Sequence, residues 1–144
     1  TDDGEPSGTA GRPALAVLQG SGLGDVAVVV TRYFGGTKLG TGGLVKAYGD
    51  AVREVLKLVR RAVKIPTITA AIEMPYPLYA QIERLVGISG GEILESQFLA
   101  DVSLIVRFKE ENWQPFVQQL QELSSGKIEP LILERNPETI FPVD

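Results

Sequence analysis

The order of apolar and polar positions separates the chain into two differently built halves. In the first half, residues 26–33 (VAVVVTRY) are almost continuously apolar and β-branched, which predicts a buried strand. Residues 44–63 carry apolar side chains three and four positions apart, which predicts a long amphipathic helix. The run over residues 14–19 is short and apolar, and it fits either a helical turn or a strand.

The second half alternates regularly between strand and helix patterns. Strands are predicted over residues 67–74, 92–99, 102–109 and 128–134, and helices over residues 77–86 and 112–124. Strand, helix, strand, strand, helix, strand is the ferredoxin-like order. Pro66 disfavours continuation of the preceding helix, so we place the domain boundary there. We therefore predict an α+β chain with one domain over residues 1–65, a ferredoxin-like domain over residues 66–134 and a tail over residues 135–144.

The composition restricts the chemistry available to the chain. Hydrophobic residues make up 44% of the sequence and charged residues 22%, which is typical of a packed globular protein. The chain has no Cys and no His, which excludes Ser-His-Asp and Cys-His triads and most zinc hydrolases. A carboxylate site for magnesium stays possible. We assign no catalytic residue, no cofactor and no bound metal.

The ends and the hydropathy of the chain bear on its location. No apolar run approaches the ~20 residues that cross a bilayer, and no charged-then-apolar export signal opens the sequence. We therefore expect no membrane association and a cytoplasmic protein. The sequence opens on Thr1 and enters a dense polar motif at once, so we expect that an N-terminal stretch is missing.

Charge is distributed unevenly about a net value of −4. Residues 1–65 hold nine basic and six acidic residues, whereas residues 66–144 hold five basic and twelve acidic ones. This division favours contact of an anionic partner with the first half. Ordinary variation of surface charge is the alternative.

Two sequence blocks carry a family resemblance. DDGEPSGTAGRP at residues 2–13 and VVVTRYFGGTKLGTGGLVKAYG at residues 28–49 resemble the two signature blocks of the YigZ/IMPACT family. The part after Pro66 resembles the ferredoxin-like domain of bacterial YigZ-type members. The resemblance implies a ribosomal protein S5 domain 2-like fold for the first domain, here partial because the strands that precede the first block in the family are missing. It also implies a role around translation, with no firmly assigned reaction.

The glycine-rich segment between the predicted strand and helix is the main candidate site. A strand, a glycine loop and a helix leave free backbone N–H groups at the helix start, where Thr41 is the predicted N-cap, and these groups favour an anion. The alternative is that the glycines only allow close packing of strand and helix. No GxxxxGK[ST] spacing is present, which argues against a P-loop NTPase. The predicted anion or nucleic-acid site comprises Arg12, Arg32, Tyr33, Gly35, Gly36, Lys38, Gly40, Thr41, Gly42, Gly43 and Lys46.

Three carboxylates near the start form a second, acidic candidate. Asp2, Asp3 and Glu5 could bind magnesium beside a phosphate. They could equally cap turns or pair with Arg12 and Arg32, and the turn-like sequence favours this structural interpretation.

Three functions remain open at this point. The first is a translation-associated protein that binds RNA or a ribosomal surface through the glycine-rich segment, with Tyr33 and Phe34 available to stack on bases. The second is an enzyme or sensor of a phosphorylated metabolite that uses magnesium and the carboxylates. The third is a protein–protein adaptor that uses the ferredoxin-like sheet. Tyr48 lies on the apolar stripe of the predicted helix and is assigned to the core.

Overall fold

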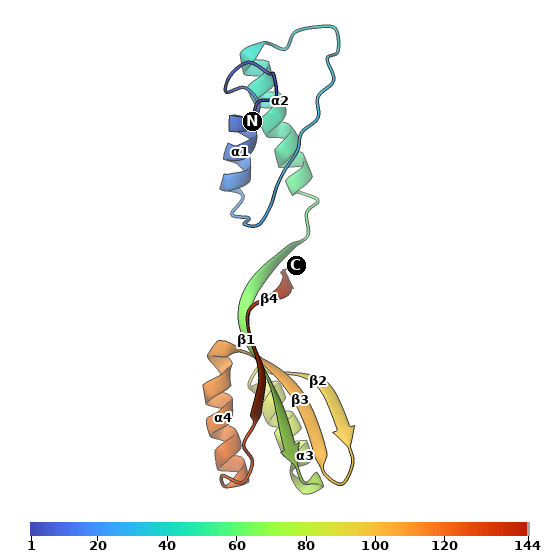
Figure 1. Cartoon of the computed structure of the whole chain (residues 1–144), viewed down its shortest axis with the longest axis vertical. Coiled ribbons are helices and arrows are strands. Elements are labelled where there is room, and N and C mark those ends of the chain that lie inside the picture. The colour runs from blue at the N-terminus through green and yellow to red at the C-terminus, as the bar shows by residue number, and fades with distance from the viewer. Residues whose placement is uncertain (144) are drawn as a thin grey trace. The chain divides into compact units, whose positions relative to one another are not determined.

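The computed structural model describes residues 1–143, and the chain divides into two compact units (Figure 1). Unit 1 is Thr1–Arg60 and unit 2 is Arg61–Asp144. The division therefore lies before the predicted boundary at Pro66, which sits inside a strand of unit 2. Unit 1 is mainly helical and unit 2 combines a sheet with two helices, so the chain has an α+β architecture.

Unit 1 is built on two packed helices, α1 (Gly11–Gly20) and α2 (Gly40–Leu56). Its small core contains Ala10, Leu44 and Tyr48, and Val30 packs against them. The long helix was predicted to run to residue 63, but α2 ends at Leu56. Residues 61–63, which were predicted to continue the helix, instead pair as a strand with the end of the chain.

The predicted buried strand over residues 26–33 is wrong. These residues form no regular element, and the side chains of Val29 and Tyr33 are 87% and 88% exposed. A strand needs a neighbour to satisfy its backbone groups, and unit 1 contains no second strand that could pair with this segment. Val30 is half-buried and packs against the small core, so the apolar run is buried only in part.

Unit 2 has the ferredoxin-like order that the hydropathy pattern predicted. Its elements are β1 (Arg61–Met74), α3 (Tyr76–Ile88), β2 (Glu92–Phe98), β3 (Val102–Lys109), α4 (Glu110–Ser124) and β4 (Leu131–Val143). The sheet has the strand order β2-β3-β1-β4, and all neighbouring strands are antiparallel. This arrangement confirms the fold class.

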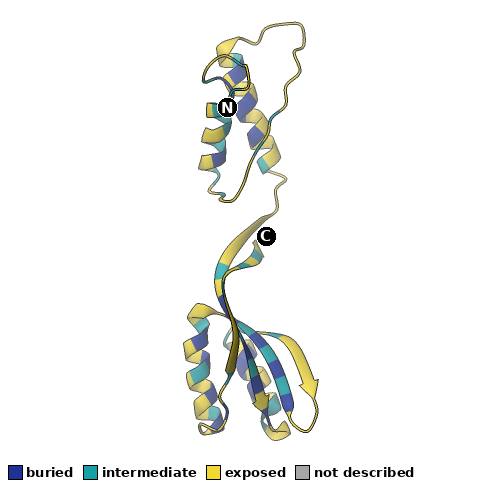
Figure 2. Cartoon of the chain, viewed as in Figure 1, coloured by how far each residue is buried: buried dark blue, intermediate teal, exposed yellow. Residues whose placement is uncertain are grey.

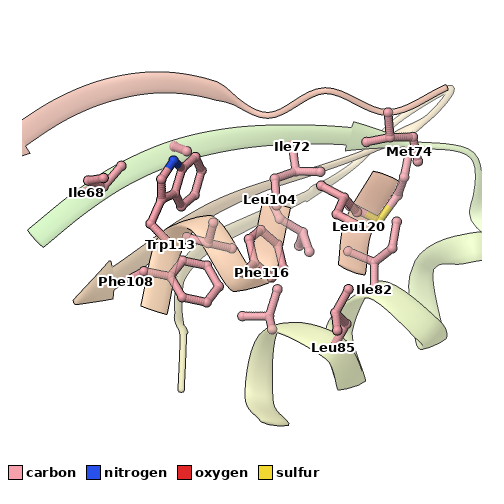
Figure 3. Packing of buried hydrophobic residues seen from close by; sticks show 14 of the residues in the cluster. Ile68, Ile72, Met74, Ile82, Leu85, Leu104, Phe108, Trp113, Phe116 and Leu120 are labelled. Carbon is pink, nitrogen blue, oxygen red and sulfur yellow. The ribbon is translucent and has the colours of Figure 1, made fainter. Parts of the chain in front are cut away.

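The core of unit 2 lies between one face of the sheet and the helices α3 and α4 (Figure 3). The burial of β3 alternates strictly, so every second side chain points into this core (Figure 2). The rings of Phe108 and Phe116 stack with their centres 4.3 Å apart, and Trp113 contacts both. A Cβ atom on Gly91 would lie 2.4 Å from Cζ of Phe108, so only glycine fits beside this ring.

The predicted tail over residues 135–144 is also wrong for the residues that the structure describes. Residues 135–143 belong to β4 and pair with β1 as far as Arg61. Residues 61–65 extend past the end of β3 and, within the described residues, pair with β4 alone. Pro66 is tolerated inside β1 because it sits at a register shift between Ile65 and Thr67, where no residue of β4 is paired with it. Asp144 lies outside the described residues.

Candidate anion-binding site

Asp2 closes the N-terminal end of α1. One oxygen of its carboxylate accepts hydrogen bonds from the backbone N–H groups of Ala10 at 3.1 Å and Gly11 at 2.8 Å, and the other accepts one from Gly8 at 2.9 Å. These bonds, with that from Gly8 having the largest effect, hold the pKa of Asp2 below its ordinary value of 3.8. A cap eight and nine residues away in sequence is outside the local capping pattern, so sequence reasoning did not identify it.

Glu5 joins three separate segments of unit 1. One oxygen of its carboxylate accepts a hydrogen bond from Nε of Arg32 and another from the hydroxyl of Tyr48, at 2.9 Å. The Arg32 guanidinium, followed by the Tyr48 hydroxyl, holds the pKa of Glu5 below its ordinary value of 4.5. Burial, together with the bond to Glu5, raises the pKa of Tyr48. Glu5 thus fastens the irregular segment of Arg32 to α2.

These contacts change what the predicted acidic residues can do. The carboxylates of Asp2 and Glu5 are occupied within unit 1, and Asp3 is exposed with a left-handed backbone. Within residues 1–143, no three Asp or Glu side chains are placed to hold a metal ion. Arg12 is exposed in the first turn of α1.

We predict that acid destabilises unit 1 through Asp2 and Glu5. A carboxylate with a depressed folded pKa contributes stability above its unfolded pKa, and this contribution is lost as the pH falls through the folded value. The protection of α1 and α2 against amide hydrogen exchange should therefore fall below about pH 5. Asp2→Asn should lower this protection at pH 7 and flatten its pH dependence. The control Asp3→Asn, at an exposed neighbour, should behave as the wild type; an equal effect of both variants would contradict the assignment.

The glycine-rich segment is open to solvent. Residues 34–42 are all exposed, and α2 begins at Gly40, with Leu39 as its N-cap and no side-chain cap. The prediction that Thr41 caps the helix is therefore wrong, since Thr41 lies inside the first turn. Gly36 and Gly40 have φ values of +89° and +75°, which residues other than glycine rarely adopt. The first N–H groups of α2 receive no side-chain cap.

Two lysines and two aromatic residues lie within this open segment or close to it in the sequence. Lys38 and Lys46 are exposed, and neither has an ion-pair partner among residues 1–143. Tyr33 and Phe34 are 88% and 63% exposed. The charge of Arg32, which was predicted to join the site, is instead matched by Glu5. The structure thus leaves two cations and two rings of this segment accessible.

The structural division of the chain weakens the charge asymmetry. Unit 1 holds seven basic and six acidic residues, and unit 2 holds seven basic and twelve acidic ones. Arg61 and Lys64, counted earlier with the first half, belong to β1, and Lys64 pairs with Glu138 at 3.4 Å. The positive character of the candidate site therefore rests on its own lysines, whereas the acidic character of unit 2 remains.

These observations define an α+β protein of two units whose first unit carries an exposed glycine-rich segment before a helix. The family described as "Impact N-terminal domain" matches residues 1–56, and the "Domain of unknown function (DUF1949)" matches residues 72–127. No helix in the described part of the chain is long and apolar enough to span a bilayer.

Similar proteins identify the family. An IMPACT family member of Haemophilus influenzae and the IMPACT family member YigZ of Escherichia coli are each 42% identical to the chain over 134 residues, which are 93% of the chain. The matches span 65% and 66% of the length of those two proteins. An IMPACT family member of Thermus thermophilus is 34% identical over 129 residues, 89% of the chain and 72% of that protein. The chain belongs to the IMPACT family.

A solved structure is similar to the chain in sequence and fold. The crystal structure of a hypothetical protein matches 93% of the chain and 65% of its own length, with 41% identity and a TM-score of 0.52. The resemblance that the two sequence blocks indicated is thus confirmed.

Proposed function

We propose that the chain is a translation-associated regulatory protein that binds single-stranded RNA, free or on a ribosomal surface, through residues 33–46. Membership of the IMPACT family supports the general role. The observation that carries the site is the shared exposure of Tyr33, Phe34, Lys38 and Lys46 within one short stretch of sequence, since none of the four is used in the core or in an ion pair of the described chain. Lysines that follow a phosphate backbone and rings that stack on bases are the two usual components of single-strand binding.

The uncapped start of α2 adds a third component to this proposed site. Its backbone N–H groups and the positive end of the helix dipole are favourable for a phosphate group. The exposed glycines allow a backbone or a base to approach closely without side-chain obstruction. A continuous contact of a few nucleotides is the expected mode, with phosphates near the lysines and bases on the rings.

The alternative of a magnesium-dependent metabolite enzyme has less support. In that alternative, Asp2, Asp3 and Glu5 would bind the magnesium ion. In the structure, Asp2 accepts hydrogen bonds from three backbone N–H groups, and Glu5 accepts hydrogen bonds from Arg32 and Tyr48. Moving either carboxylate to a metal would remove contacts that hold unit 1 together. We therefore keep RNA binding as the proposed function.

Reversal of the two lysine charges should weaken RNA binding. Lys38→Glu with Lys46→Glu should lower the affinity for a single-stranded RNA by at least about tenfold at low salt, because two phosphate contacts become repulsive. Filter binding of the intact chain measures this change. The matched control is Lys109→Glu with Lys127→Glu, which changes the net charge equally on unit 2 and should leave the affinity within about twofold. An equal loss in both variants, or no binding by the wild type, would contradict the proposal.

A further inference from the structure

The sheet of unit 2 has one face that the helices of the same unit, α3 and α4, do not cover. The side chains of Val106 and Phe108 point into the core with α3 and α4, so the alternate residues Ile105 and Arg107 of β3 point to the opposite face. Strand register extends this face across the sheet, since Ile105 lies opposite Ala71 of β1. We call this surface the open face. A half-exposed sheet face is ordinary in antiparallel proteins, and its chemistry decides whether it has a partner.

The centre of the open face is apolar. Ala71 lies opposite both Ile105 of β3 and Leu131 of β4, so these three side chains form one row across three strands. Ala71 and Ile105 are half-buried, whereas Leu131 is 66% exposed. Leu133, the residue at the register shift of β4, is 52% exposed beside this row. The row therefore leaves apolar surface in water on the β4 side.

The border of the open face is acidic. Glu95 pairs with Ile105 in register, Glu134 pairs with Thr69, and Glu73 follows Ala71 by two positions on β1, so all three lie on the same side of the sheet as the apolar row. None of the three carboxylates has an ion-pair partner within residues 1–143.

The arginine of the open face does not offset these charges. The guanidinium of Arg107 donates to Glu92 at 2.7 Å, and its central carbon lies 5.6 Å from the centre of the Phe141 ring. Its charge is therefore already matched. Lys109 lies on the same face opposite Thr67, so a phosphate backbone approaching this face would meet three carboxylates against one ammonium group, a net charge of −2. The face repels nucleic acid and is complementary to a cation.

We propose that the open face binds a basic amphipathic helix of a partner protein. Its apolar stripe would cover Ile105 and Leu131, as α3 and α4 cover the other face, and its lysine or arginine side chains would reach Glu73, Glu95 and Glu134. Charge complementarity selects this occupant, because both the apolar row and the acidic border are then satisfied. This surface is separate in sequence from residues 33–46, so it does not depend on RNA binding by unit 1.

The test uses the intact chain and a fluorescent synthetic amphipathic helix of leucine and lysine as the probe. We expect the probe to shift the backbone amide NMR signals of residues 69–73, 103–107 and 131–134. Glu73→Gln, Glu95→Gln and Glu134→Gln together should weaken binding at least about tenfold, and Leu131→Ser should weaken it at least about threefold. Leu131 is mostly exposed, so this variant is expected to fold.

The matched control changes as many charges on the helices. Glu83→Gln, Glu111→Gln and Glu122→Gln together give the same net charge, lie on α3 and α4, and should alter the affinity by less than about twofold. An equal loss in the control would show a general attraction of charges and overturn the proposal. Signal shifts at the open face on addition of single-stranded RNA, or on raising the protein concentration without the probe, would also overturn it, in favour of RNA or of a second copy of the chain.

Discussion

Replacement of Phe116 by alanine is expected to lower the free energy of unfolding of unit 2 by about 3–5 kcal/mol. Phe116 is completely buried between the sheet and α3, and its ring stacks on Phe108 (Figure 3). The variant loses the burial of the ring and leaves a cavity that the neighbouring side chains only partly fill. Because Trp113 lies beside this ring, urea unfolding followed by its fluorescence measures the change directly.

Phe98 provides the control for this substitution. Its ring is 53% exposed and meets Tyr79 edge-on at 5.3 Å, so Phe98→Ala should cost no more than about 1.5 kcal/mol. Equal losses for Phe98→Ala and Phe116→Ala would show that the buried cluster is not the main source of stability in unit 2.

Removal of both exposed rings of the proposed RNA site should have the largest effect on binding. Stacking of a base on an aromatic side chain contributes about 1–3 kcal/mol, so Tyr33→Ala with Phe34→Ala should weaken binding of a single-stranded RNA by at least about thirtyfold. An RNA that carries 2-aminopurine gives a second measurement, because stacking quenches its fluorescence. We expect the wild type to quench this signal and the double variant to leave it unchanged.

Unit 2 contains a matched pair of exposed aromatic residues. Tyr76 and Phe98 are 48% and 53% exposed, and their joint replacement by alanine should not change RNA affinity or quenching. If removal of this pair weakens binding as much as removal of Tyr33 and Phe34, the rings of residues 33–46 are not the stacking surface.

The sequence predicted unit 2 well because its pattern and its contacts agree. The pattern over residues 102–109 predicted a strand, and the predicted bounds are those of β3 in the structure. The last strand was predicted too short because its second half pairs only with the start of β1, a contact between distant parts of the chain. Local patterns carry no information on such a partner.

The sequence predicted unit 1 less well. The run at residues 26–33 has the composition of a buried strand, yet burial and pairing depend on neighbouring strands that this run does not encode. The same error left Tyr33 undecided, because this residue was predicted both to end a buried strand and to be available for stacking on bases, and only the structure shows it 88% exposed. Glu5 was recognised as a possible partner of Arg32, whereas its bond to Tyr48 required the packing of α2.

The salt dependence of RNA binding tests the central proposal most directly. The affinity of the intact chain for a single-stranded RNA should be measured at several salt concentrations, beside a variant with Lys38→Gln and Lys46→Gln. If both lysines contact phosphates, the slope of log affinity against log salt should be smaller in magnitude by about 1.4 in the variant, because each lost phosphate contact removes about 0.7. An unchanged slope would place the contacts outside residues 33–46 and contradict the proposed site.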